Sequence, residues 1–271
     1  MATKEYLKGA LFSKPDVRDY VAKTTLSEFP KEFELKMPKV KNQKSVGSCV
    51  AHSLSTVVEY FNKQETGKYT EMSTGYIYGN RRLSLHKGSG MYTRDAIHTA
   101  VKYGDVPNSY FPVNIEVPEA IEEFENKVDG IEKTGYYFKF AEYFKLKDEN
   151  SIKTCLMENG PVVFAMPWYD DIVIKDGVMQ TKCVKTAKTG GHCMVIYGWN
   201  ETGWKVQNSW GSYWGNKGRV VIPYDVTLRE VWGIKDAPGD GSLVLDKPFK
   251  TKFGEFLAKI LNKILLLFHK D

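Results

Sequence analysis

The sequence predicts an α+β protein with two lobes, on the basis of three observations. Apolar residues recur at helical spacing between about residues 45 and 128, which indicates a helical lobe. After about residue 130 and as far as residue 235, short apolar segments alternate with Gly and Asn, which is typical of strands. The chain has 271 residues, 42% of them hydrophobic and 13% aromatic, enough for a sizeable core. A cleft between two such lobes is a common place for an active site.

Three helices are expected in the first lobe. Apolar side chains follow the helical period from Cys49 onward, so Cys49 begins the first of them. Residues 93–103 form the second, with Thr93 as its cap and Gly104 as its end. Residues 118–128 form the third.

The second lobe, residues 130–235, is expected to form an antiparallel sheet with one helix. The aromatic content of residues 134–146 indicates a strand. Residues 148–166 are expected to form a helix that ends at Gly160-Pro161, followed by another strand. Three later apolar segments complete the expected sheet: HCMVIYGWN, GWKVQNSW and GRVVIPYD.

Both ends of the chain are expected to lie outside this domain. Residues 1–28 form a polar N-terminal strap, packed permanently on the body through the stretch KPDVRDYV. Residues 236–246 form a linker, and residues 247–271 form a basic amphipathic helix that is too short in its apolar part to span a bilayer. This helix binds a membrane surface, binds a protein partner, or packs on its own body or on a copy of itself.

The charge and the cysteines exclude several classes of protein. The formal net charge is +5, of which residues 247–271 carry +4, so the body is not expected to bind nucleic acid. There is no CxxC pair and no apolar leader, so we expect no metal site, no cofactor, no disulfide framework and no signal peptide. The expected location is cytoplasmic or virion-associated, with secretion by another route left open. Of the other cysteines, Cys155 and Cys193 are expected in the core, and Cys183 as a free thiol.

The stretch QKSVGSCVAH places Cys49 at a helix start, where it is a core residue, a metal ligand with His52, half of a disulfide, or a nucleophile. A helix dipole favours a thiolate, and small residues before Cys49 allow close approach, which favours the nucleophile. His52 lies three residues further on the same helix and is interpreted as a half-buried or solvated histidine. His192 follows two glycines at the start of a strand, and is the better candidate base.

Further motifs support this interpretation. Asn208 can orient an imidazole, and Trp210 can shield that hydrogen bond from water. Gln43 lies six residues before Cys49, and His192 follows it by 143 residues. With Asn-Ser-Trp-Gly at 208–211, the chain resembles the papain-like cysteine peptidases over about residues 29–235.

The resemblance implies a papain-like two-lobe fold, with a helical lobe and a barrel-like antiparallel lobe, and a metal-independent endopeptidase acting on proteins or peptides. It implies that Cys49 is the nucleophile, His192 its partner and Asn208 the group that orients His192. The Gln43 side chain and the Cys49 backbone N–H form the oxyanion hole. The alternatives are a specialised peptidase for cell-wall peptides or virion proteins, and a scaffold that binds through its C-terminal helix.

The resemblance also implies a substrate-binding surface and a subtype. Gly90, Met91 and Tyr92 border the pocket for the residue two before the cut, Ala165 lines its floor, and Gly191 offers a carbonyl. These residues suggest an apolar substrate side chain, while Trp210 covers the site. Val46, Val50 and the segment Gly88-Ser89-Gly90-Met91 depart from secreted relatives, and fit a disulfide-free bacterial or viral type.

Overall fold

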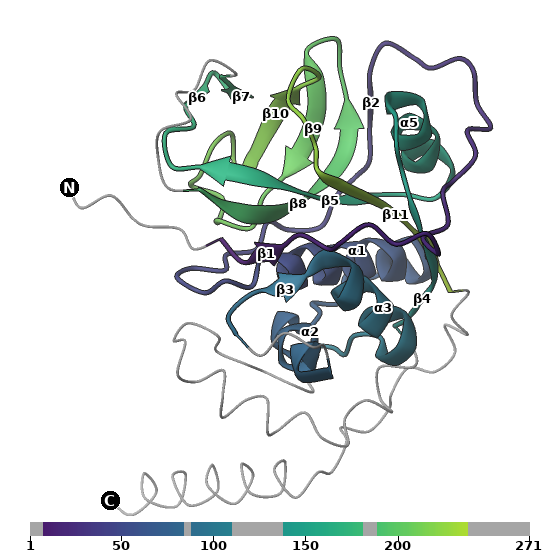
Figure 1. Ribbon diagram of the computed structural model, residues 1–271, viewed down its shortest axis with the longest axis vertical. Coiled ribbons are helices and arrows are strands. Elements are labelled where there is room, and N and C mark those ends of the chain that lie inside the picture. The colour runs from purple at the N-terminus through teal and green to yellow at the C-terminus, as the bar shows by residue number, and fades with distance from the viewer. Residues whose placement is uncertain (1–7, 84–87, 110–137, 181–188, 238–271) are drawn as a thin grey trace, which may run out of the picture. The chain divides into compact units, whose positions relative to one another are not determined.

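The computed structural model describes residues 8–83, 88–109, 138–180 and 189–237 (Figure 1). The expected helices at 118–128 and 247–271 lie outside the described residues, as does Cys183. None of the described helices has both the length and the apolar content to cross a membrane.

The first lobe is built around one buried helix, α1 (Cys49–Thr66). Thirteen residues from Val50 to Asn62 are buried, because α1 packs on other helices on one side and on strand β8 on the other (Figure 1). Gly67 ends the helix in the left-handed conformation with its N–H bonded to the Lys63 carbonyl. Helices α2 (Thr74–Gly79) and α3 (Thr93–Tyr103) pack around it, and the 3₁₀ turn η1 (Asn80–Leu83) contacts both of these.

Two buried polar side chains of α1, Glu59 and Ser55, are paired with groups outside the helix. The Glu59 carboxylate bonds Lys41 at 2.6 Å and accepts the Met72 N–H at 2.9 Å. The Ser55 hydroxyl donates to Asp105 at 2.8 Å, just beyond the end of α3. These pairs fix the loops on either side of α1, since a buried charge without partners would be costly.

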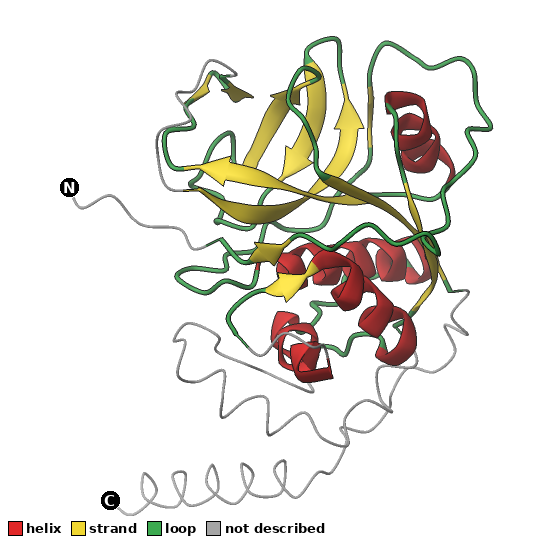
Figure 2. Cartoon of the chain, viewed as in Figure 1, coloured by secondary structure: helices red, strands yellow, loops and turns green. Residues whose placement is uncertain are grey.

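The second lobe is a large, mostly antiparallel sheet, with strand order β4-β11-β5-β8-β9-β10-β7-β6 in the described residues and β2 added to β8. The one departure from antiparallel pairing among these described strands is between β10 and β7. Figure 2 shows α1, α2 and α3 gathered on one side of the strands, with α5 apart from them. The strands are β2 (Phe33–Glu34), β4 (Phe140–Lys145), β5 (Val162–Tyr169), β6 (Ile174–Lys175), β7 (Val178–Met179), β8 (Thr189–Trp199), β9 (Gly203–Gln207), β10 (Arg219–Pro223) and β11 (Glu230–Asp236).

Helix α5 (Glu149–Glu158) has defined ends at both termini. At its start the Asp148 carboxylate accepts the Ser151 N–H at 2.7 Å, and the Ser151 hydroxyl accepts the Asp148 N–H at 3.2 Å, which is a capping box. The chain then turns at Gly160, whose positive φ of 124° suits glycine, and enters β5. The expected stop at Gly160-Pro161 is confirmed.

The structure confirms an α+β fold with a helical part and a large sheet, and it corrects the assignment of one helix cap. Thr93 is the first residue of α3 and not its cap, because Tyr92 occupies the cap position in an extended conformation. Tyr92 is held there by a short parallel pairing of β3 (Met91–Tyr92) with β1 (Ala10–Leu11).

Candidate active site

Cys49 lies at the first turn of α1, where the helical lobe meets β8, and its side chain is fully buried. The backbone N–H groups of Val50 and Cys193 face its sulfur and lower the pKa of the thiol. Burial has the larger effect, and the pKa of Cys49 lies above its usual value. The sulfur thus sits at a helix N-terminus but in a site from which water is excluded.

His192 lies near the start of β8, and Asn208 directly follows β9. The His192 Nε2 and the Asn208 Oδ1 are 2.8 Å apart. Because an amide oxygen only accepts, Nε2 carries the proton, and in the neutral ring Nδ1 presents a lone pair. Nδ1 is buried without a hydrogen-bond partner in the part of the chain that is described. The arrangement leaves one imidazole nitrogen ready to accept a proton.

Two indoles enclose this histidine. The Trp210 ring stacks on the His192 ring at 4.3 Å between centroids with an interplanar angle of 19°. The Trp168 ring meets His192 edge-on at 5.5 Å. The expected cover by Trp210 therefore exists, whereas sequence reasoning missed Trp168, which lies in β5 without a motif around it.

Gln43 is buried, and its side-chain amide is fixed at both ends. Its Nε2 donates to the Val46 carbonyl at 2.8 Å, and its Oε1 accepts the Ser209 hydroxyl at 2.7 Å. The Gln43 N–H also bonds the Ser209 carbonyl at 2.8 Å. Ser209 follows Asn208, so one short segment positions both Gln43 and the partner of His192. Sequence reasoning missed this role of Ser209.

The N-terminal strap crosses this site. Gly9 lies between Gly47 and Gly90, and a Cβ on Gly9 would overlap the Gly47 carbonyl. The Gly9 carbonyl accepts the Met91 N–H at 2.8 Å, and the Gly9 N–H faces the Cys49 sulfur. The strap therefore presents a backbone hydrogen-bond donor to the Cys49 sulfur.

Residues 13–22 fasten the strap to both lobes. The Arg94 guanidinium of α3 lies 3.6 Å from Asp16 and 3.2 Å from Asp19. Further along, the Ala22 N–H bonds the Lys145 carbonyl at 3.1 Å, next to a parallel bridge between Val21 and Lys145. The expectation of a strap packed on the body agrees with these contacts, but its path over Cys49 was not foreseen.

Electrostatics keep the covered site neutral. Burial lowers the pKa of His192 to about 4, and the nearby Lys8 of the strap acts in the same direction, although Asn208 opposes it. Burial raises the pKa of Cys49. A thiol with a raised pKa and an imidazole with a lowered pKa do not exchange a proton at neutral pH. The strap-covered protein holds these groups uncharged.

Most of the residues expected to bind substrate lie against the strap. Tyr92 pairs with Leu11, Met91 pairs with Ala10, and Gly90 and Gly191 both lie against strap carbonyls. Ala165 is buried in β5 and pairs with Cys193 in β8. Four of these residues thus lie against the strap, whereas Ala165 lies within the sheet and Trp210 lies over His192.

The other cysteines and His52 have structural surroundings. Cys155 and Cys193 are buried, as expected, and burial raises the pKa of Cys155 to about 12. The interpretation of His52 as half-buried or solvated is wrong, because His52 is 4% exposed and its Nδ1 lies 2.9 Å from the Ser48 carbonyl. Burial lowers the pKa of His52 to about 3, so it is a neutral core residue.

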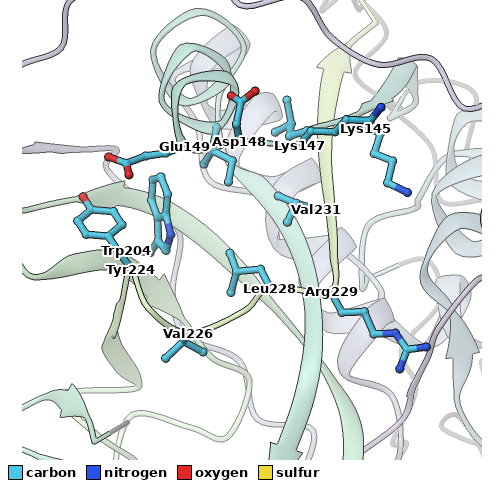
Figure 3. A pocket seen from close by; sticks show the side chains of 12 residues that line it. Lys145, Lys147, Asp148, Glu149, Trp204, Tyr224, Val226, Leu228, Arg229 and Val231 are labelled. Carbon is cyan, nitrogen blue, oxygen red and sulfur yellow. The ribbon is translucent and has the colours of Figure 1, made fainter.

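A pocket of about 320 Å³ lies at the start of β11, where β4 leads into α5. Trp204 and Tyr224 stand on one side of it, and Arg229 points away from them on the other (Figure 3). None of Cys49, His192 or Asn208 lines it, so it is separate from the candidate site.

Comparisons with known proteins find relatives over most of this chain. Residues 29–237 match the model of the papain family of cysteine proteases. An uncharacterized peptidase C1-like protein of Acanthamoeba polyphaga mimivirus is 28% identical over 264 residues, covering 82% of this chain and 83% of that protein. A cathepsin L 1 of Paramecium tetraurelia is 30% identical over 195 residues, covering 70% of this chain and 56% of that protein.

The fold has a clear counterpart among solved structures. Xylellain, a cysteine protease from Xylella fastidiosa, superposes with a TM-score of 0.74 over 85% of this chain and 96% of its own, at 24% identity. A viral relative and a bacterial structure of this kind fit the expected bacterial or viral type. The chain belongs to the papain family of cysteine proteases.

Proposed function

We propose that the protein is an endopeptidase in which Cys49 is the nucleophile, His192 its acid–base partner and Asn208 the residue that orients the imidazole. The observation that carries this proposal is the 2.8 Å bond between His192 Nε2 and Asn208 Oδ1 beneath the stacked Trp210. It leaves His192 Nδ1 as the proton acceptor, with Cys49 at the neighbouring helix N-terminus.

The reaction then follows from these positions. The Cys49 thiol gives its proton to His192 Nδ1, and the thiolate attacks the peptide carbonyl carbon. The Gln43 amide and the Cys49 N–H bind the oxygen as it becomes negative. His192 returns the proton to the leaving amine, and water then hydrolyses the thioester, with His192 taking a proton from the water.

The described conformation is the closed form of this enzyme. A substrate carbonyl has to reach the Cys49 sulfur, which the Gly9 N–H now faces. When residues 8–12 lift away, water and substrate reach Cys49 and His192, and the cost of charging both groups falls. The strap remains attached but moves, which refines the expectation of a permanently packed segment.

Labelling of the full chain with an epoxysuccinyl thiol-protease inhibitor tests the proposal. We expect one label per chain, lost in Cys49→Ala, strongly slowed in His192→Ala and kept in Cys155→Ala, because Cys155 is a buried thiol outside the site. Hydrolysis of a peptide library by the same variants should follow the same order. A folded protein that takes no label on Cys49 and cleaves no peptide would instead favour a binding scaffold.

A further inference from the structure

A second thiol, that of Cys193, lies beside Cys49. Cys193 directly follows His192 in β8, and both cysteines are completely buried in one cluster of apolar side chains that includes residues of α1 and β8. Both are free thiols. Successive side chains of a strand point to opposite faces, so Cys193 faces away from the side that carries the His192 imidazole. The mechanism proposed above uses His192 and leaves the Cys193 thiol without a role.

Two separate contacts hold Cys193 against the first turns of α1. The backbone N–H of Cys193 faces the Cys49 sulfur, so β8 passes within reach of that sulfur. The Ser53 hydroxyl is a hydrogen-bond partner of the Cys193 sulfur. Ser53 lies one helical turn after Cys49, and Cβ atoms so spaced are about 5–6 Å apart on the same face of a helix. The Cys49 and Cys193 sulfurs therefore lie along one face of α1.

The ionisation of Cys193 reflects the nearby Cys49. Burial raises the pKa of Cys193 well above its usual value, and Cys49 acts in the same direction, whereas Ser53 opposes both. An effect of one sulfur on the other requires that they lie close together, because the interaction falls with distance. Cys155 provides the contrast, since burial raises its pKa to about 12 with no contribution from another cysteine.

This arrangement suits a disulfide. Cysteines are joined in proteins when their Cα atoms lie about 4.4–6.8 Å apart. The contact of the Cys193 N–H with the Cys49 sulfur is compatible with this range, because that nitrogen is bonded directly to the Cys193 Cα. Cys49 lies at a helix N-terminus, where a thiolate is favoured, so it is the thiol that an oxidant attacks first. Cys193 is then the thiol within reach of the oxidised sulfur.

We propose that Cys49 and Cys193 form a reversible disulfide when the protein meets hydrogen peroxide, so that the pair is a site of oxidative modification. The inference rests on the proposed function in that it takes Cys49 as the reactive thiol. The Cys49 sulfur attacks peroxide and breaks its O–O bond, which gives a sulfenic acid on Cys49 and, with the proton that Cys49 releases, one water. The Cys193 sulfur then attacks the Cys49 sulfur, the S–O bond breaks, and the departing hydroxide takes the Cys193 proton. Two thiols are oxidised, and one peroxide is reduced to two waters.

The disulfide has two effects on the proposed nucleophile. It occupies the sulfur that would attack a peptide carbonyl, so the oxidised protein is inactive and takes no epoxysuccinyl label. It also prevents further oxidation of Cys49 to the sulfinic acid, which thiols do not reduce. Reduction of the disulfide by a small thiol restores both cysteines.

Peroxide treatment of the full chain, blocking of the remaining free thiols and trypsin digestion without reducing agent test the inference by mass spectrometry. Trypsin places Cys49 in residues 45–63 and Cys193 in residues 189–205, apart from the other two cysteines. We expect these two peptides to be joined after oxidation and separated by dithiothreitol. Peptidase activity and epoxysuccinyl labelling should be lost and regained in parallel with this bond.

Two variants show which thiol protects Cys49, each compared with its own activity before oxidation. In Cys193→Ala, excess peroxide should carry Cys49 to the sulfinic acid, and dithiothreitol should restore little activity. Cys155→Ala is the matched control, because Cys155 is another buried thiol outside the site. It should lose and regain activity as the wild type does.

The inference fails if peroxide inactivates the wild type without joining the two peptides, if Cys49 is joined to Cys183 instead, or if Cys193→Ala recovers as fully as the wild type. Because the strap covers Cys49, Gly9→Ala is treated in the same way, and the absence of the bond from both proteins overturns the inference. The bond is detected by mass, so it is measured even without peptidase activity. A protein that forms the bond but cleaves no peptide would refute the proposed function alone, and an active peptidase that never forms it would refute the inference alone.

Discussion

Gly9 of the strap lies so close to Gly47, two residues before Cys49, that a side chain on Gly9 would overlap the Gly47 carbonyl oxygen. The neighbouring atom belongs to the backbone, so it cannot rotate away. We predict that Gly9→Ala displaces the strap and speeds epoxysuccinyl labelling of Cys49 by about tenfold or more, a loss of roughly 1.4 kcal/mol in closing free energy. The measurement is the labelling rate of the full chain.

Val17→Ala is the matched control for this experiment, since Val17 belongs to the strap but is fully exposed. Its labelling rate should equal that of the wild type. If Gly9→Ala labels no faster than either, then the strap does not limit access to Cys49.

Trp210 shields the hydrogen bond between His192 and Asn208 through its stacking on the imidazole. We predict that Trp210→Phe admits water, raises the pKa of His192 from about 4 toward its usual 6.5 and lowers kcat about tenfold. An NMR titration of the imidazole measures the pKa. Trp204→Phe is the control, because Trp204 is a buried tryptophan that packs on Tyr224. An unchanged titration in Trp210→Phe would refute the shielding role.

The side-chain amide of Gln43 is held by Val46 and Ser209. We predict that Gln43→Ala lowers kcat by about 10²–10³ with little change in KM, because an oxyanion donor acts in the transition state. Gln207→Ala removes another buried amide and should change kcat less than about twofold. Steady-state kinetics distinguish the two variants, and full kcat in Gln43→Ala would remove Gln43 from the site.

Asp105 is completely buried, and burial raises its pKa to about 8, although the Ser55 hydroxyl and the Val106 N–H act in the opposite direction. The folded protein thus binds a proton here more tightly than the unfolded chain between pH 3.8 and 8. Stability contributed by this group falls as the pH rises through that window. Asp105→Asn should match the wild type near pH 4 and exceed it by roughly 2–5 kcal/mol above pH 8.

Denaturant unfolding at pH 4.5 and pH 8.5 (buffers of about equal ionic strength) measures this difference. Asp225→Asn, at an exposed aspartate after β10, should give the same stability difference from the wild type at both pH values. Parallel pH curves for Asp105→Asn and the wild type would mean that Asp105 is ionised in the folded state.

The sequence predicted those parts of the fold that depend on local pattern. Helical periodicity located the start of α1 at Cys49 and both ends of α3, and the Gly160-Pro161 stop separated α5 from β5. Thr93 was wrongly given the cap position, which Tyr92 occupies, since the pairing that makes Tyr92 extended comes from strap residues more than eighty positions earlier. Local pattern carries no information about such a partner.

The candidate site was likewise predicted in those parts that depend on local motifs, and missed in those that depend on distant partners. Motif spacing singled out His192 and Asn208, which the structure places 2.8 Å apart. His52 was described incorrectly, because its burial comes from the packing around α1 and its hydrogen bond to Ser48 is internal to the helix.

The strap and the site that it covers belong to one chain, so closure of the strap over Cys49 does not depend on the protein concentration. Closing is a unimolecular step whose effective concentration is set by the length of the connecting segment, in the millimolar range for short connections. Dilution therefore leaves the closed fraction unchanged. A free peptide with the sequence of residues 8–22 would need to approach millimolar levels to replace a strap that had been cut from the body.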